Sequence, residues 1–260
     1  MIIAGKTFEN HTFVMAIVNL TPDSFYAGSR ATEDDVLFRV ERAVKEGAAV
    51  IDLGAQSTRP GYGEVSAEEE LSRLEKPLTA IVKNFDIPIS VDTYFPSVAR
   101  AALRAGAHMI NDIKGLSAEN MAETVAKFNA SACIMHSAGK QLRGDIFPPV
   151  LNFLRDAASR AVAVGVDKDK IILDGGIGFA KDGEQSLNLL NNYERLSALG
   201  YPLLLGASRK SLFGGRAEDR LGATLNSTRL AVKKGVLFVR VHDVGENVRA
   251  IEEEYERNHN

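Results

Sequence analysis

Two cations, Arg209 and Lys210, follow Ser208 directly after an apolar run that ends in glycine, LLLGASRKS at 203–211. A hydroxyl and two positive charges at the end of a buried strand offer hydrogen-bond donors to a bound molecule. A single stretch of this kind is also typical of an ordinary strand end. Its meaning depends on whether other strands of the chain end in the same way.

The other apolar runs also end in polar residues. These residues are Asn19, Asp52, Asp92, Asn111 with Asp112, His136, Asp174, and Arg240 with His242 and Asp243. Each alone has a structural explanation, because a strand-end aspartate often caps the next helix. A barrel of parallel strands, however, directs all of these side chains toward one mouth. The repetition therefore predicts a binding site.

The side chains at the middle strands favour a flat heterocycle as the ligand. Asp92, Asn111 and Asp174 offer two carboxylates and an amide. A ring rich in N–H and amino donors needs paired acceptors, together with an amide that both donates and accepts. Lys210 suits a carbonyl or nitrogen of the same ring.

A phosphate site is indicated where the first and last strands meet. Asn19, Arg240 and His242 lie on runs that become neighbours once a barrel closes, and a helix begins just after them. Arg59 adds a cation on a loop rich in glycine and proline that could move over the site. No C-x-x-C or H-E-x-x-H zinc motif occurs. Mg²⁺ is compatible with a phosphate substrate and one or two oxygen ligands.

Eight short apolar runs alternate with helix-patterned stretches. The runs are FVMAIVN, AAVIDLG, IPISVD, AHMIND, ASACIMH, KIILDGG, YPLLLGAS and LFVRVHD. They are continuous, as in parallel strands that are buried on both faces. Among the helices, one is expected to begin at Ser66 and one to cover 184–200.

This order predicts a single (β/α)8 TIM barrel over residues 1–260, with the active site at the C-terminal ends of the strands. An open doubly wound sheet is the alternative. The first run is followed by NLTPDSFYAGSR rather than G-x-G-x-x-G, which argues against a dinucleotide-binding fold.

Composition and charge argue against several classes of protein. The net charge of −3 and the absence of a Lys/Arg tract argue against nucleic acid or an anionic membrane as partner. No signal peptide and no apolar run near the ~20 residues of a membrane span are evident. Cys133 is the only cysteine, in an apolar run, and we expect it to be buried and to fit a reducing compartment. The prediction is a soluble cytoplasmic protein.

The order of the motifs resembles the dihydropteroate synthase family of pterin-binding barrels. The motifs are VNLTPDSF, STRPG, SVDT, IND, MH, DGGIGF, GASRKS and RVHDV. Each is weak alone, but eight in order over one barrel-length chain are specific. SRK together with RVHDV favours the synthases over their folate-methyltransferase relatives.

The resemblance implies a transferase of folate biosynthesis. Such enzymes join 6-hydroxymethyl-7,8-dihydropterin diphosphate to p-aminobenzoate, giving 7,8-dihydropteroate and pyrophosphate without a covalent enzyme intermediate. It also implies Mg²⁺ and a homodimer formed through helices on one side of the barrel.

The resemblance also assigns roles to residues. Asp92, Asn111, Asp174, Gly206 and Lys210 would bind the pterin, and Arg209 would pack against the pterin face or support that pocket. Asn19, Arg240 and His242 would bind the diphosphate, with Asn19 also near the metal. Thr58, Arg59, Pro60, Phe179 and Ser208 would bind p-aminobenzoate. The catalytic set would be Asp92, Lys210, Arg240 and His242.

Four stretches depart from the family pattern. Tyr26-Ala27-Gly28-Ser29 replaces Ser-Asp-Gly-Gly, which removes the aspartate of the first loop. Asp174-Gly175-Gly176 replaces Asp-Pro-Gly, and we expect glycine to loosen a turn that proline would stiffen. Gln185-Ser186 stands for His-Asn, and SAG follows His136 in place of a Met-x-Gly-like loop.

These departures leave open a pterin-binding paralogue with little or no synthase activity. Two further alternatives explain less. A folate-dependent methyltransferase domain has no need of Arg240 and His242 as a diphosphate clamp. A sugar-phosphate barrel gives no reason for the set of Asp92, Asn111 and Asp174.

Overall fold

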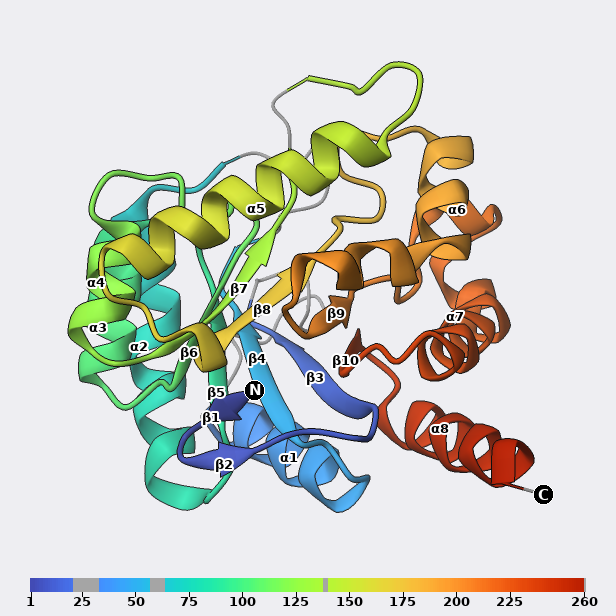
Figure 1. The fold of residues 1–260 in the computed structure, drawn as a ribbon. Coiled ribbons are helices and arrows are strands. Elements are labelled where there is room, and N and C mark those ends of the chain that lie inside the picture. The colour runs from blue at the N-terminus through green and yellow to red at the C-terminus, as the bar shows by residue number, and fades with distance from the viewer. Residues whose placement is uncertain (21–32, 57–63, 138–139, 260) are drawn as a thin grey trace.

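Eight parallel strands close into a barrel that helices surround (Figure 1). The computed structural model describes residues 1–20, 33–56, 64–137 and 140–259. The strands are β3 (Phe13–Asn19), β4 (Val50–Gly54), β5 (Ile89–Asp92), β6 (Met109–Asp112), β7 (Ser131–Met135), β8 (Ile171–Asp174), β9 (Leu203–Leu205) and β10 (Phe238–Val241). Because β10 pairs with both β9 and β3, the sheet has no open edge. The predicted (β/α)8 barrel is confirmed, and the open sheet is wrong.

Each strand is followed by a helix that packs on the outside of the barrel. The helices are α1 (Glu33–Lys45), α2 (Ala67–Asn84), α3 (Pro96–Arg104), α4 (Met121–Lys127), α5 (Phe147–Ala163), α6 (Gly183–Asn191), α7 (Leu221–Lys233) and α8 (Val244–His259). Ser66 caps α2 as expected, because its side chain accepts a hydrogen bond from the backbone N–H of Glu69 at 3.2 Å. None of the helices described is long and apolar enough to cross a membrane.

The expected helix over 184–200 is divided in two. α6 ends at Asn191, and a 3₁₀ helix, η3 (Tyr193–Leu199), follows it. At the junction the side-chain amide of Asn192 donates to the backbone oxygen of Asn188 at 2.9 Å, with φ of −126° at Asn192. This change of direction lets the Tyr193 side chain enter the core, where it is 1% exposed.

The interior of the barrel is filled from its N-terminal end. Short strands β1 (Ile2–Ile3) and β2 (Lys6–Thr7) form a hairpin, and Ile3 and Phe8 pack against apolar side chains inside the barrel. Cys133 on β7 belongs to this cluster and is buried and free, as expected. Apolar packing closes this end, whereas the polar strand ends lie at the other.

Candidate active site

An arginine from the last strand binds two carboxylates from earlier strands. Arg240 on β10 donates from Nε to Asp52 Oδ2 at 2.6 Å and from Nη2 to Asp92 Oδ2 at 2.7 Å. Asn111 on β6 donates from Nδ2 to the same oxygen of Asp52 at 3.2 Å. Four strand ends therefore meet in one network. Asp52, fully buried, is a functional candidate that the predicted site set omitted, although its strand-end position was noted.

One oxygen of each carboxylate in this network accepts no hydrogen bond from the residues that the structure describes. Within the described part of the chain, Asp52 Oδ1 and Asp92 Oδ1 are buried and accept no hydrogen bond. Burial raises the pKa of Asp92 to about 7, although the charge of Arg240 opposes the rise. Buried acceptors in proteins are almost always satisfied. These two oxygens are therefore suited to receive donors from a ligand.

Asp174 supplies another carboxylate of the site from the end of β8. Its Oδ1 accepts from the backbone N–H of Gly176 at 2.7 Å and lies 3.1 Å from the hydroxyl of Tyr193. Its Oδ2 faces Gly206, where a Cβ would lie only 3.3 Å away. A larger residue at Gly206 would therefore require this oxygen to shift by a few tenths of an ångström.

Lys210 completes this side of the mouth. Its Nζ donates to the backbone oxygen of Ile177 at 2.7 Å and lies 4.1 Å from the centre of the Phe179 ring. Its charge lowers the pKa of both Asp92 and Asp174 against the rise that burial causes. The structure therefore brings together the predicted carboxylates, the lysine and an aromatic ring.

Ser208 and His242 form a pair between β9 and β10. The Ser208 hydroxyl lies 2.9 Å from His242 Nδ1 and accepts from the backbone N–H of His242 at 3.3 Å. The Ser208 hydroxyl can donate to Nδ1, and the ring's own proton then lies on Nε2. An imidazole in this form donates to an anion through Nε2.

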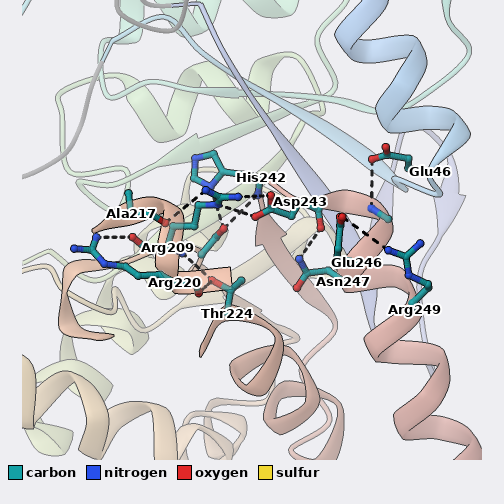
Figure 2. A network of polar contacts seen from close by, with 12 residues as sticks. Glu46, Arg209, Ala217, Arg220, Thr224, His242, Asp243, Glu246, Asn247 and Arg249 are labelled. Carbon is teal, nitrogen blue, oxygen red and sulfur yellow. Dashed lines mark hydrogen bonds and ion pairs between the residues drawn. The ribbon is translucent and has the colours of Figure 1, made fainter. Parts of the chain in front are cut away.

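The Arg209 side chain points toward Asp243 (Figure 2). Its Nε and Nη2 donate to the two oxygens of Asp243 at 2.8 and 2.6 Å. Its backbone, with φ of 52°, is held by Thr224 and Arg220, as Figure 2 shows. Arg209 is therefore fixed by Asp243, Thr224 and Arg220, and both roles that the resemblance implied stay predictions.

Asn19 lies at the end of β3 beside β4. Its Oδ1 is 3.4 Å from the position that a Cβ on Gly54 would take, and its backbone oxygen accepts from Arg39 at 3.1 Å. The described residues contain no group of three or more His, Cys, Asp or Glu side chains that could hold a metal ion. Thr58, Arg59 and Pro60, and the altered stretch from Tyr26 to Ser29, lie outside the described residues.

Lys181 is a second residue that the sequence did not single out. It is 8% exposed, and its Nζ lies within 3.0 Å of His136 Nδ1 and the backbone oxygens of Gly176 and Phe179. Burial lowers the pKa of Lys181 to about 7. Burial and the neighbouring ammonium lower the pKa of His136 to about 3. The only feature of the sequence that points to Lys181 is its position two residues after the DGGIGF motif.

Comparisons with known proteins agree with this geometry. The family described as "Pterin binding enzyme" matches residues 15–242. A dihydropteroate synthase of Clostridium beijerinckii is 44% identical over 259 residues, covering 96% of both chains.

Two solved structures are also similar. A dihydropteroate synthase of Clostridium difficile, crystallised in the presence of pteroic acid, has a TM-score of 0.93 and 40% identity, covering 96% of this chain and 98% of its own. A dihydropteroate synthase of Xanthomonas albilineans with 4-aminobenzoic acid has a TM-score of 0.91 and 36% identity, covering 96% of this chain and 94% of its own.

Proposed function

The chain belongs to the pterin-binding enzyme family, among its dihydropteroate synthases, and we propose how its barrel mouth carries out their reaction. The reaction condenses 6-hydroxymethyl-7,8-dihydropterin diphosphate with p-aminobenzoate and releases pyrophosphate. The observation that carries the assignment of the pterin pocket is Asp92, a buried carboxylate whose Oδ1 accepts no hydrogen bond from the described residues.

The pterin is held by acceptors around the mouth. Asp92, Asn111 and Asp174 receive its ring N–H and amino donors, and Lys210 donates to its carbonyl or ring nitrogen. Asp52 binds Arg240 and Asn111, and so fixes the two side chains that flank the ring. A cation that develops at the methylene carbon is stabilised by the electron-rich ring and by the Asp92 carboxylate.

The diphosphate leaves toward the first and last strands. His242 donates to the diphosphate through Nε2, in the tautomer whose Nδ1 accepts from Ser208. Asp52 and Asp92 each take one of the five N–H donors of Arg240, on Nε and Nη2, and the guanidinium reaches an anion through the others. Both groups stabilise the charge that grows on the leaving group.

The described residues fit a Mg²⁺ ion that arrives with the diphosphate rather than one held by a protein cage. Asn19 offers one amide oxygen at the strand end, and Gly54 leaves space beside it. Mg²⁺ is commonly held by one or two protein oxygens together with substrate phosphates. When bound, the ion would supply charge neutralisation for the leaving diphosphate.

The p-aminobenzoate site is assigned to Phe179 and Ser208, as the resemblance implies. Phe179 offers an aromatic face beside Lys210, and Ser208 offers a hydroxyl. Thr58, Arg59 and Pro60 belong to this site by resemblance. The amine of p-aminobenzoate attacks the methylene as the diphosphate leaves.

We propose a cytoplasmic homodimer as the working form. The single buried thiol of Cys133 is consistent with a reducing compartment, and the resemblance supports a dimer formed by helices on one side of the barrel. Sedimentation of the purified protein measures the oligomeric state directly.

The test of the function is release of pyrophosphate from the pterin diphosphate with Mg²⁺, with and without p-aminobenzoate. We expect release that depends on p-aminobenzoate. Tight pterin binding without such release would favour the paralogue instead, an alternative that the comparisons do not support. Replacing Ala27 by aspartate should then raise turnover if the first loop limits it.

A further inference from the structure

The hydroxyl of Tyr193 meets three polar atoms beneath the mouth of the barrel. It accepts from the backbone N–H of Gly175 at 2.8 Å, and it lies 2.6 Å from the backbone oxygen of Leu204 and 3.1 Å from Asp174 Oδ1. Tyr193 is among the largest fully buried side chains. A buried phenol needs partners for its hydroxyl, and here one of those partners is a predicted pterin ligand.

These contacts lie where two strands separate. Asp174 ends β8 and is paired in register with Leu204 of β9. The Tyr193 hydroxyl contacts both residues of this pair, and the backbone N–H of Gly176 binds Asp174 Oδ1. The Gly176 N–H donates to Oδ1, and the single hydrogen of the Tyr193 hydroxyl is shared between Oδ1 and the nearer backbone oxygen of Leu204, whereas Oδ2 is left beside Gly206.

Gly175 fits this arrangement in two ways. A Cβ at this position would lie 3.0–3.1 Å from side-chain atoms of Leu196, Leu189 and Tyr193, so a larger residue would require them to shift. Its N–H, which a proline lacks, is the donor to the Tyr193 hydroxyl. The backbone N–H of Gly175 is anchored to η3 in this way, and the expectation that glycine loosens the turn stays a prediction.

We propose that Tyr193 is a positioning residue for the pterin site, holding the Asp174 carboxylate by Oδ1 and the turn at Gly175 so that Oδ2 is presented to the heterocycle. The proposal rests on the proposed function, because it needs Asp174 to bind the pterin. Tyr193 does not itself contact the ligand.

The proposal predicts a change in how pterin binding depends on pH. Burial raises the pKa of Asp174, while the Gly176 N–H, the charge of Lys210, the Tyr193 hydroxyl and the charge of Lys181 each lower it. The charge of Arg240 also interacts with the Asp174 carboxylate, and the Cys133 thiol lies on the core side of that carboxylate. Loss of the hydroxyl should raise the pKa of Asp174 further. Binding that needs the ionised carboxylate should then weaken at a higher pH than in the wild type.

The first test is Tyr193→Phe, which keeps the ring and removes the hydroxyl. We expect the Kd for 6-hydroxymethyl-7,8-dihydropterin diphosphate, measured by calorimetry across pH, to rise about tenfold, as for loss of a hydrogen bond to a charged group. The acid limb of the binding curve should move to higher pH. The KM for p-aminobenzoate should stay within about twofold, because that ligand does not touch Asp174.

Tyr255→Phe is the matched control. Tyr255 lies on α8, with its hydroxyl 3.5 Å from Thr12 Oγ1 near the opposite end of the barrel. Its loss should leave the pterin Kd and the pH limb unchanged.

A second pair of variants separates the N–H of Gly175 from the space around it. Gly175→Ala and Gly175→Pro both add a Cβ, but only proline removes the donor to Tyr193. We expect the proline variant to weaken pterin binding several-fold more than the alanine variant, as for loss of a hydrogen bond.

The result that overturns the proposal is a Tyr193→Phe enzyme with unchanged pterin Kd and pH limb, or with equal losses for both substrates. A ¹³C-carboxyl NMR titration of Asp174 without ligand gives a separate measure. If the wild type binds no pterin, the proposed function fails. An Asp174 pKa that is the same with and without the hydroxyl refutes the role of Tyr193, whatever the pterin does.

Discussion

At the scale of single residues, the two carboxylate oxygens of Asp92 and of Asp174 are used in the same way. Each gives one carboxylate oxygen to the protein, Asp92 to Arg240 and Asp174 to the turn at Gly176. The other oxygen stays at the mouth, unpartnered in Asp92 and beside Gly206 in Asp174. An acceptor fixed in this way needs no reorganisation when a ligand arrives, which favours binding of one heterocycle in one orientation.

Asp174→Asn should weaken pterin binding by about 2–3 kcal/mol, because a charge-assisted hydrogen bond is lost. Calorimetric titration of the variant with the pterin diphosphate measures this directly. Asp169→Asn, in the exposed segment before β8, is the control and should bind as the wild type does. Unchanged affinity in Asp174→Asn would remove Asp174 from the pterin site.

Asp92 should give pterin binding a pH dependence. The pKa of Asp92 is about 7 without ligand, and the ionised form is the acceptor, so affinity should fall as pH drops below about 7. The fall should approach tenfold for each pH unit. Kd values measured from about pH 5.5 to pH 8 test it. An Asp92→Asn variant that kept the same slope would assign the titration to another group.

At the scale of elements, the loop between β8 and α6 is built around two ammonium groups. Lys181 binds the backbone oxygens of Gly176 and Phe179, and Lys210 binds that of Ile177. The loop carbonyls thus accept hydrogen bonds from two lysine side chains, and the Phe179 ring is placed beside Lys210. Gly176, with φ of 69°, is required here, because a Cβ would lie 2.0 Å from the backbone oxygen of His136.

Lys181→Met should loosen this loop and raise the KM for p-aminobenzoate about tenfold, because Phe179 loses its anchor. The pterin Kd should change less, since Asp92 and Asn111 lie on other strands. Lys170→Met is the control, because its ammonium binds Asn129 before β8 begins. Equal losses for the two substrates would show that Lys181 supports the whole mouth.

The sequence predicted the elements better than it predicted the contacts between them. Continuous apolar runs defined the strands, and polar strand ends such as Asp92 and Asp174 were found because a barrel brings them together. The bond from Arg240 to Asp52 was not predictable, because it depends on how far one side chain reaches across the mouth. Tyr193 was missed because it lies in an expected helix that the structure breaks at Asn192.

At the scale of the whole molecule, one end of the barrel contributes to stability and the other end carries the chemistry. The N-terminal hairpin closes one end, where Phe8 stacks edge-on against Phe13 and Phe238 with ring centres 5.1 Å apart in both pairs. The polar network of Arg240 and the carboxylates lies at the other end. Changes at the closed end should therefore alter the free energy of unfolding and leave substrate affinity unchanged.

Phe8→Ala should lower the free energy of unfolding by about 3–5 kcal/mol, because it leaves a cavity under the barrel. Denaturant titration measures the loss, and the KM values of the folded variant should match those of the wild type. Phe38→Ala on α1 is the control, since that ring is 66% exposed. A shift in the KM for either substrate would mean that the two ends are coupled.

The buried thiol of Cys133 makes it possible to measure opening of the barrel. Its thiol is wholly enclosed by the strands, and burial raises its pKa, so a thiol reagent meets it only when the barrel opens. The rate of labelling under native conditions therefore times complete opening of the barrel. Any molecule that binds the closed barrel slows this reaction in proportion to its occupancy. Labelling of Cys133 therefore measures ligand affinity without an assay of enzyme activity.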